Sequence, residues 1–203
     1  MPSKRTYVSP LREQAAVRTR ELIVGHATEL FAERGYGRVT VADIAAAAGV
    51  AAKTVFASVG SKSDILNRIV DQGVSASGYE QAMTALLAER TPESVLRMLA
   101  HGTRRGNEGQ LTVHEAIRKA LPVHEDGEAL WERATADYRD ALHTAARHLH
   151  TLSPPPAHPV RETADLLWLW FGPTGWRTLV IESGWTWDHA EDVLYRTALT
   201  ALH

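Results

Sequence analysis

The chain has 203 residues and contains no cysteine, so neither a disulfide framework nor a thiolate site for metal or redox chemistry is available to it. Long hydrophobic runs are lacking too. The longest uninterrupted apolar stretches, at 44–52 and 166–172, are far shorter than the roughly 20 residues of a membrane-spanning helix. The beginning of the sequence, MPSKRTYVSPLREQ, has no apolar core of the length that a signal peptide needs. We therefore expect a soluble cytoplasmic protein with no membrane partner.

Patterns that mark common active sites are also lacking. There is no G-x-S-x-G elbow, no P-loop, no G-x-G-x-x-G and no H-E-x-x-H. His114 and Glu115 are sequence neighbours, whose side chains point apart on a helix. The spacings of His143, His148 and His150 do not put neighbouring ligands on one helical face, which favours solvated or structural histidines over a metal site. We expect no enzyme activity, no metal and no cofactor.

The net charge is only −2, but the charge is unevenly distributed. Residues 1–70 hold ten Lys and Arg against six Asp and Glu, whereas residues 71–203 hold twelve against eighteen. The net negative charge of the whole chain argues against a protein that binds nucleic acid over its entire surface. The net positive charge of the first third is typical of a local DNA contact. Residues 1–10 are expected to be a disordered basic arm. A solvated terminus is favoured there over an arm that reaches the minor groove of DNA.

No stretch of the chain has the pattern of a strand, and the helical spacing of its apolar residues predicts an all-α fold. A first long helix is expected over 11–34. Thr40, with Asp43 three residues later, forms a capping box that begins a second, short helix. Gly49 lies where the chain must turn, because glycine enters the left-handed region at no steric cost.

A third short helix is expected over 54–59, with Val55, Phe56 and Val59 as its apolar residues. Two short helices joined across a glycine turn are typical of a helix-turn-helix, whose second helix lies in the DNA major groove. A second capping box, Ser61-Lys62-Ser63-Asp64, opens the next helix with a lysine in its first turn. A cation opposes the helix dipole at that position, so exposed amides and Lys62 together would suit a DNA phosphate.

The stretch GHATELFAERGYGRVTVADIAAAAGVAAKTVFASVGSKSDIL resembles the N-terminal domain of TetR-family transcriptional regulators, from about residue 18 to residue 69 without a gap. The resemblance includes Leu-Phe followed by Glu-Arg-Gly-Tyr, Ile-Ala-x-x-Ala-Gly-Val, and Ser-Lys before the fourth helix. The family usually has tyrosine at Phe56, and often histidine, phenylalanine and proline at Ser58, Val59 and Gly60. Phe56 lacks the tyrosine hydroxyl that would bind a phosphate. Ala51 replaces the usual Ser or Thr N-cap, which should lower the stability of the helix by about 1 kcal/mol.

The resemblance implies a DNA-binding domain over 11–72 that contacts a palindromic operator in double-stranded DNA. Lys53 and Thr54 would face the groove, Ala51 and Ala52 would pass close to bases or thymine methyl groups, and other residues would contact phosphates. The full set of candidate DNA-binding residues is Arg38, Thr40, Ala51, Ala52, Lys53, Thr54, Phe56, Ser58 and Lys62.

Residues 79–203 are expected to form a helical ligand-binding and dimerisation domain. Helices are predicted over about 92–106, 111–121, 126–152 and 160–171, with a break at Gly172-Pro173 and further helix after it. Two apolar C-terminal helices favour pairing with a second copy as a four-helix bundle. The candidate dimerisation residues are Trp176, Val180, Val193, Leu194 and Ala198.

All six tryptophans lie beyond residue 130. Each alone is best explained as core or interface, but as a group they also suit an apolar ligand cavity. The resemblance implies such a cavity, for an unidentified small apolar or aromatic ligand, among the helices of this domain. Candidate lining residues are Met98, His101, Trp131, Tyr138, Trp168 and Phe171, with Arg104 as a polar anchor.

Two hypotheses follow. In the first, the protein is a homodimeric regulator, a repressor by resemblance, that a small-molecule ligand releases from DNA. In the alternative, it is a helical small-molecule-binding or interaction protein that has lost DNA recognition, as the substitutions at Ala51 and Phe56 and the modest basic charge would allow.

Overall fold

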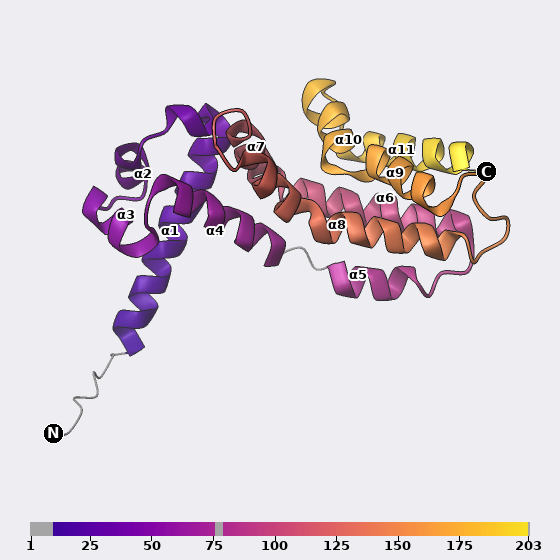
Figure 1. The fold of residues 1–203 in the computed structure, drawn as a ribbon, viewed down its shortest axis with the longest axis horizontal. Coiled ribbons are helices and arrows are strands. Elements are labelled where there is room, and N and C mark those ends of the chain that lie inside the picture. Colours follow the sequence, from indigo (N-terminus) through magenta and orange to yellow (C-terminus); the bar gives the residue numbers. More distant parts are fainter. Residues whose placement is uncertain (1–9, 76–78, 203) are drawn as a thin grey trace. The chain divides into compact units, whose positions relative to one another are not determined.

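The computed structural model describes residues 10–75 and 79–202, which fold into helices without a strand (Figure 1). The predicted all-α fold is therefore confirmed. The chain divides into two compact units, of which the first extends to Gln72 and takes in Thr112–Trp131. The second consists of Gly73–Leu111 and the chain from Glu132 onward. The predicted basic arm lies, apart from Pro10, outside the described residues.

The first unit is built around a long helix that packs on the helical hairpin predicted from the sequence. Its elements are α1 (Pro10–Arg34), the single 3-10 turn η1 (Tyr36–Arg38), α2 (Val41–Ala47), α3 (Ala52–Val59), α4 (Lys62–Ser75) and α7 (Leu111–Ala120). Apolar residues at helical spacing on α1, α2, α3 and α4 form the core of the unit. Fully buried members are Ile23, Val24, Ala27, Phe31, Ile44, Val55, Ile65, Leu66, Ile69 and Val70.

The segment after α6 packs differently from the sequence prediction, which placed all of 79–203 in one domain. Residues 112–131 group with the first unit. Ser63 Oγ is 2.8 Å from His124 Nε2, and the ring centroids of Tyr36 and His124 are 5.3 Å apart at a steep angle. Lys119 Nζ donates to the backbone carbonyls of Ala32 and Glu33 at the end of α1. The predicted helix thus exists, but it packs on the first unit.

The second unit is a helical bundle in which α6 and α11 have the most extensive contact. Its elements are α5 (Tyr79–Leu86), α6 (Pro92–Gly109), α8 (Gly127–Leu149), α9 (Val160–Phe171), α10 (Pro173–Arg177), the π-helical turn η2 (Thr178–Glu182) and α11 (Trp187–Leu202). Thr91 caps α6, accepting a hydrogen bond from the Ser94 amide, and Pro92 stands in the first turn as predicted. The sequence prediction missed α5, whose eight residues are too few for a clear helical period.

The break predicted at Gly172-Pro173 is confirmed, since α9 ends at Phe171 and α10 begins at Pro173. A helix end leaves carbonyl groups without an intrahelical partner. Two buried side chains satisfy the Phe171 carbonyl: the Tyr138 hydroxyl donates to it, and Trp176 Nε1 donates over 3.1 Å. Tyr138 precedes the break in sequence and Trp176 follows it. Specific hydrogen bonds from both therefore stabilise the end of α9.

Among the described residues, no single helix has the length and apolar composition needed to cross a membrane. Only α2 and α3 taken together reach those limits, and they form a sharply bent pair.

His114 is a largely buried titratable group of the first unit. It lies on α7, where its ring meets the ring of Trp131 edge to face with the centroids 6.2 Å apart. Burial lowers the pKa of His114 from 6.5 to about 4. The folded chain thus holds the imidazole neutral where the unfolded chain would bind a proton.

Because the folded pKa is depressed, His114 should stabilise the fold above about pH 6.5, and this contribution should be lost progressively as the pH falls toward 4. The full loss is on the order of 3 kcal/mol. Urea unfolding of the protein and of His114→Gln between pH 7 and pH 4 measures it. The variant should show a smaller fall in unfolding free energy over this range, whereas the exposed His189→Gln should match the parent. Equal pH slopes for His114→Gln and the parent would contradict the prediction.

Candidate DNA-binding and ligand-binding sites

The helical hairpin of the first unit has the geometry of a helix-turn-helix. The axes of α2 and α3 are bent by 99° from one another, and Gly49 between them has φ +66°, in the left-handed region. The predicted capping box of α2 is confirmed. Thr40 Oγ1 accepts from the Asp43 amide at 3.2 Å, and the Asp43 carboxylate accepts from the Thr40 amide at 2.8 Å. The hydrogen bonds from Thr40 lower the pKa of Asp43.

Helix α3 buries one side and leaves the other open. Val55 and Val59 are 0% and 3% exposed, and they hold the helix against the core. Phe56 was expected to share in this packing, but the structure corrects this, because its side chain is 56% exposed. It follows the buried Val55 by one residue, and one residue rotates the side chain by about 100° around the helix axis. Ala51 is the N-cap and provides no side-chain hydrogen bond, as expected.

Most of the predicted DNA-binding residues lie on accessible parts of this hairpin. Ala51, Ala52 and Lys53 are exposed, and Thr54 and Ser58 are half-buried at its margins. Ser58 is further tied to α1, because Arg20 Nε donates to its carbonyl over 3.2 Å. Two more candidates precede α2: Arg38, in η1, and the cap Thr40 are both exposed.

The structure corrects the role predicted for Lys62. Its Nζ donates to the backbone carbonyls of Tyr36 at 2.9 Å and Val39 at 3.0 Å, and it lies 4.2 Å from the centre of the Tyr36 ring. Partial burial lowers the pKa of Lys62. A lysine in the first turn of α4 opposes the helix dipole, and these carbonyls provide the compensating charge. Lys62 is therefore a structural cation of the turn before α2, with its ammonium bound to two backbone carbonyls.

The Ser61-Asp64 capping box is confirmed beside it. The Asp64 carboxylate accepts from the Ser61 amide at 2.8 Å, and Ser61 Oγ accepts from the Asp64 amide at 3.2 Å. These hydrogen bonds lower the pKa of Asp64. The first turn of α4 is thus capped by its own side chains.

The second unit contains a cavity of about 680 Å³ bounded by α5, α6 and α8. Three of the predicted ligand-binding residues, Met98, His101 and Tyr138, line it. Apolar side chains make up much of the remaining wall, and polar groups stand near them. The apolar residues of the wall include Met83, Leu86, Leu99, Ala141 and Leu142. The polar residues include Gln81, Thr103, Arg105 and Gln110.

The sequence prediction missed the glycines that open this cavity. Gly102, Gly106 and Gly109 line it from α6, and a Cβ atom added to any of them would meet nothing within 4 Å. The signal was present in the sequence, because spacings of four and three residues place these glycines on one helical face. The sequence prediction ended this helix at about residue 106, since glycine usually marks a helix terminus. Instead α6 continues to Gly109.

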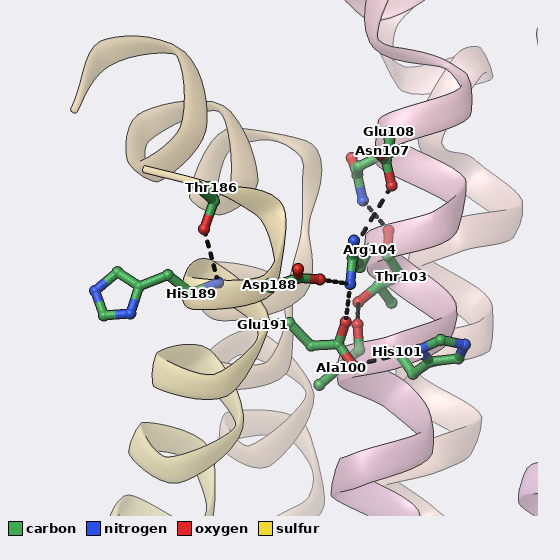
Figure 2. A network of polar contacts seen from close by, with 10 residues as sticks. All are labelled: Ala100, His101, Thr103, Arg104, Asn107, Glu108, Thr186, Asp188, His189 and Glu191. Atoms are coloured by element: carbon green, nitrogen blue, oxygen red, sulfur yellow. Dashed lines mark hydrogen bonds and ion pairs between the residues drawn. The ribbon is translucent and has the colours of Figure 1, made fainter. Parts of the chain in front are cut away.

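Four predicted ligand-binding residues lie elsewhere. Arg104 belongs to an ion-pair network between α6 and α11 (Figure 2). Trp131 lies in the first unit against His114. Trp168 packs with Tyr138 and lies under the Arg139 guanidinium, and Phe171 is fully buried in the core. Helical phase was the missing information, because a residue one position away on a helix faces a direction about 100° apart.

The Arg104 network is specific in its geometry. Arg104 Nη1 lies 2.5 Å from Asp188 Oδ1 and 3.0 Å from Glu191 Oε2, while Glu191 also approaches His101 Nδ1 at 3.3 Å. Figure 2 shows Arg104 directed from α6 toward the two carboxylates of α11. The hydrogen bond with Glu191 is the main cause that raises the pKa of Arg104. The guanidinium therefore fastens α11 to α6 and is not directed into the cavity.

The structure also corrects the predicted dimerisation residues. Trp176, Leu194 and Ala198 are 1%, 6% and 0% exposed, so they belong to the core of a single chain. Val180 and Val193 are half-buried and retain some accessible surface. Large apolar side chains are exposed nearby in sequence at Leu169 (62%) and Ile181 (44%).

No cluster of three or more histidine and acidic side chains that could hold a metal ion occurs in the described part of the chain. The exposed side of the α2–α3 hairpin and the cavity of the second unit are the candidate binding surfaces.

The fold and the hairpin define a helical protein with an N-terminal helix-turn-helix. Residues 23–69 match the family model of the bacterial regulatory proteins of the tetR family. The resemblance is thereby confirmed, and the chain carries the N-terminal domain of TetR-family transcriptional regulators. No curated protein sequence matches the chain significantly.

Solved structures share the fold over nearly the whole chain. The TetR-family regulator PfmR from Thermus thermophilus is 20% identical, with a TM-score of 0.67 over 91% of this chain and 95% of its own. The fatty acid degradation regulator FadR from Bacillus halodurans is 14% identical, with a TM-score of 0.73 over 98% and 99%. FadR from Bacillus subtilis, solved with stearoyl-CoA, is 16% identical, with a TM-score of 0.69 over 90% and 98%.

Lys62→Met should lower the free energy of unfolding by about 1–3 kcal/mol, because the Tyr36 and Val39 carbonyls lose a charged donor. Urea unfolding followed by far-ultraviolet circular dichroism measures the change. The matched control is Lys53→Met, which removes an exposed ammonium and should stay within about 0.5 kcal/mol of the parent. If both variants were as stable as the parent, Lys62 would have no structural role.

Proposed function

We propose that the protein is a DNA-binding transcriptional regulator. The observation that carries this proposal is the accessible side of α3, at 99° to α2, within the segment that matches the tetR family model. This geometry suits insertion of α3 into the major groove while α2 crosses the backbone. The exposed cations Arg38, before α2, and Lys53, in the first turn of α3, suit contacts with DNA.

We further propose that the regulator is a homodimer on a palindromic operator. Two copies of α3 related by a twofold axis would enter major grooves roughly 34–36 Å apart, or a multiple of that spacing. The exposed Leu169 of α9 and Ile181 of η2, with the half-buried Val180, offer apolar surface for the second copy. This surface replaces the buried residues that the sequence suggested.

The cavity of the second unit is proposed to bind a small, largely apolar ligand that releases the protein from DNA. Its volume of about 680 Å³ falls within the usual range of ligand pockets. A regulator with the same fold was solved with stearoyl-CoA, which supports a ligand with a substantial apolar part. Such a ligand would act as an inducer only if it bound the conformation of low DNA affinity more tightly than the conformation that binds DNA.

The alternative, a helical binding protein without DNA recognition, predicts the same cavity but no operator. The exposed cations Arg38 and Lys53 on and beside the hairpin argue against it, because positive charge on a helix-turn-helix suits a DNA partner. DNA binding decides between the two proposals.

Duplexes selected by the protein from a random library should bind with an affinity that falls steeply as the salt concentration rises, because phosphate contacts release counterions. Lys53→Ala should weaken binding by roughly tenfold or more, whereas Arg90→Ala, which removes an exposed cation of the second unit, should leave it unchanged. A gel shift at several salt concentrations provides the measurement. Failure of the library to yield any bound duplex would favour the alternative proposal.

Gly106→Leu should fill the cavity without a steric clash, because a Cβ atom there meets nothing within 4 Å. Replacing a helical glycine should also stabilise the fold by about 0.5–1 kcal/mol. Fluorescence titration with anilinonaphthalene sulfonate should show at least roughly tenfold weaker binding, with no fall in the melting temperature. The control Gly25→Leu, on α1, also has open space and should bind the probe like the parent. Unchanged probe binding in Gly106→Leu would show that this cavity is not the apolar site.

A further inference from the structure

The outward side of α3 has an unusual composition for a surface that recognises DNA. Residues 52, 53, 56 and 57 are all exposed, and their spacings of three and four residues place them along one side of the helix, next to the side buried by Val55 and Val59. This recognition surface, defined as Ala52, Lys53, Phe56 and Ala57, holds two methyl groups, a phenyl ring and a single ammonium. Its largest member is the 56% exposed Phe56.

The recognition surface has little capacity to read bases through hydrogen bonds. The pairings that distinguish bases in the major groove use arginine or lysine on guanine, asparagine or glutamine on adenine, and carboxylates on cytosine. Within α3, whose sequence is AKTVFASV, only Lys53 belongs to that set. The hydroxyls of Thr54 and Ser58 are half-buried at the margins of the helix.

Apolar contact with the C5-methyl group of thymine is the base readout that phenyl and methyl side chains can make. Resting on the DNA-binding function proposed above, we propose that α3 recognises its operator chiefly through thymine methyl groups, with Phe56 as the main contact. Ala52 and Ala57 provide the close approach that small side chains allow. Lys53 and the exposed Arg38 supply the positive charge that a DNA partner requires, which favours DNA over an apolar protein partner at this surface.

The proposal also gives a reason for the difference between this chain and its family at position 56. A tyrosine there would direct its hydroxyl to a phosphate, as the resemblance implies. Phe56 has no such group, and the exposed ring has no hydrogen bond to make. Its exposure to water is unfavourable in the free protein and is relieved when the ring meets an apolar group on a base edge.

The test uses the full-length protein and duplexes selected by it from a random library. Each selected duplex is prepared with thymine and again with uracil in place of every thymine. This change removes only the C5-methyl groups and keeps the base pairing. If each half-site loses one contacted methyl group, each loss weakens binding about fourfold. The uracil duplex should therefore bind at least roughly tenfold more weakly to the dimer.

Phe56→Ala identifies the protein side of the contact. The variant should bind thymine duplexes more weakly and should discriminate between thymine and uracil duplexes by a much smaller ratio than the parent. Leu22→Ala is the matched control, because it truncates a 49% exposed apolar side chain of α1 in the same unit and should keep the full ratio. Thermal unfolding verifies that both variants fold.

The outcomes separate the proposals. Binding of thymine and uracil duplexes with equal affinity would overturn methyl recognition and leave the regulator function intact. A uracil effect that persists in full in Phe56→Ala would overturn the assignment to Phe56. Absence of any selected duplex would instead overturn the DNA-binding function itself.

Discussion

The position of the helix-turn-helix depends on one partly buried cation. Lys62 joins the first turn of α4 to the Tyr36 and Val39 carbonyls, on either side of the turn that leads from α1 into α2. The Tyr36 ring packs beneath the ammonium and also meets the Phe31 ring at 5.1 Å. An ammonium with carbonyl acceptors at two points fixes the path of the chain between them. The entry to α2, and through it the direction of α3, therefore follows from an interaction outside the recognition surface.

In the second unit, the comparable constraint is the carbonyl of Phe171 at the end of α9. Tyr138 and Trp176 donate to it, and Asn107 Nδ2 in turn donates to the Tyr138 hydroxyl over 3.0 Å. Tyr138 also lines the cavity. A ligand that moved this ring would disturb the hydrogen bonds that hold the end of α9 and the start of α10. The cavity and the C-terminal helices thus share a chain of buried polar contacts, which is the physical continuity that coupling requires.

Sequence reasoning predicted what depends on local chemistry. The capping boxes at Thr40 and Ser61, the glycine turn at Gly49 and the break at Gly172-Pro173 each rest on residues adjacent in the chain, and each was confirmed. Apolar spacing correctly predicted the long helices but missed the short α5. What the sequence did not contain was the rotation of each helix relative to its neighbours. That rotation decides whether Phe56 is buried, whether Arg104 faces the cavity, and where α7 packs.

The same limit explains the dimerisation residues. Both apolar C-terminal helices need partners, and periodicity cannot distinguish a partner in the same chain from one in a second copy. Leu194 and Ala198 are buried within the single chain, so the apolar face of α11 already packs against its own bundle. Leu169 precedes the break after α9 and Ile181 lies in the π-helical turn beyond it, and both remain exposed. A π-helical turn changes the rotation of the residues that follow it, because it adds one residue to the turn. Ile181 lies within this turn and Leu169 precedes the break, and both stay accessible as apolar surface that the chain itself leaves uncovered.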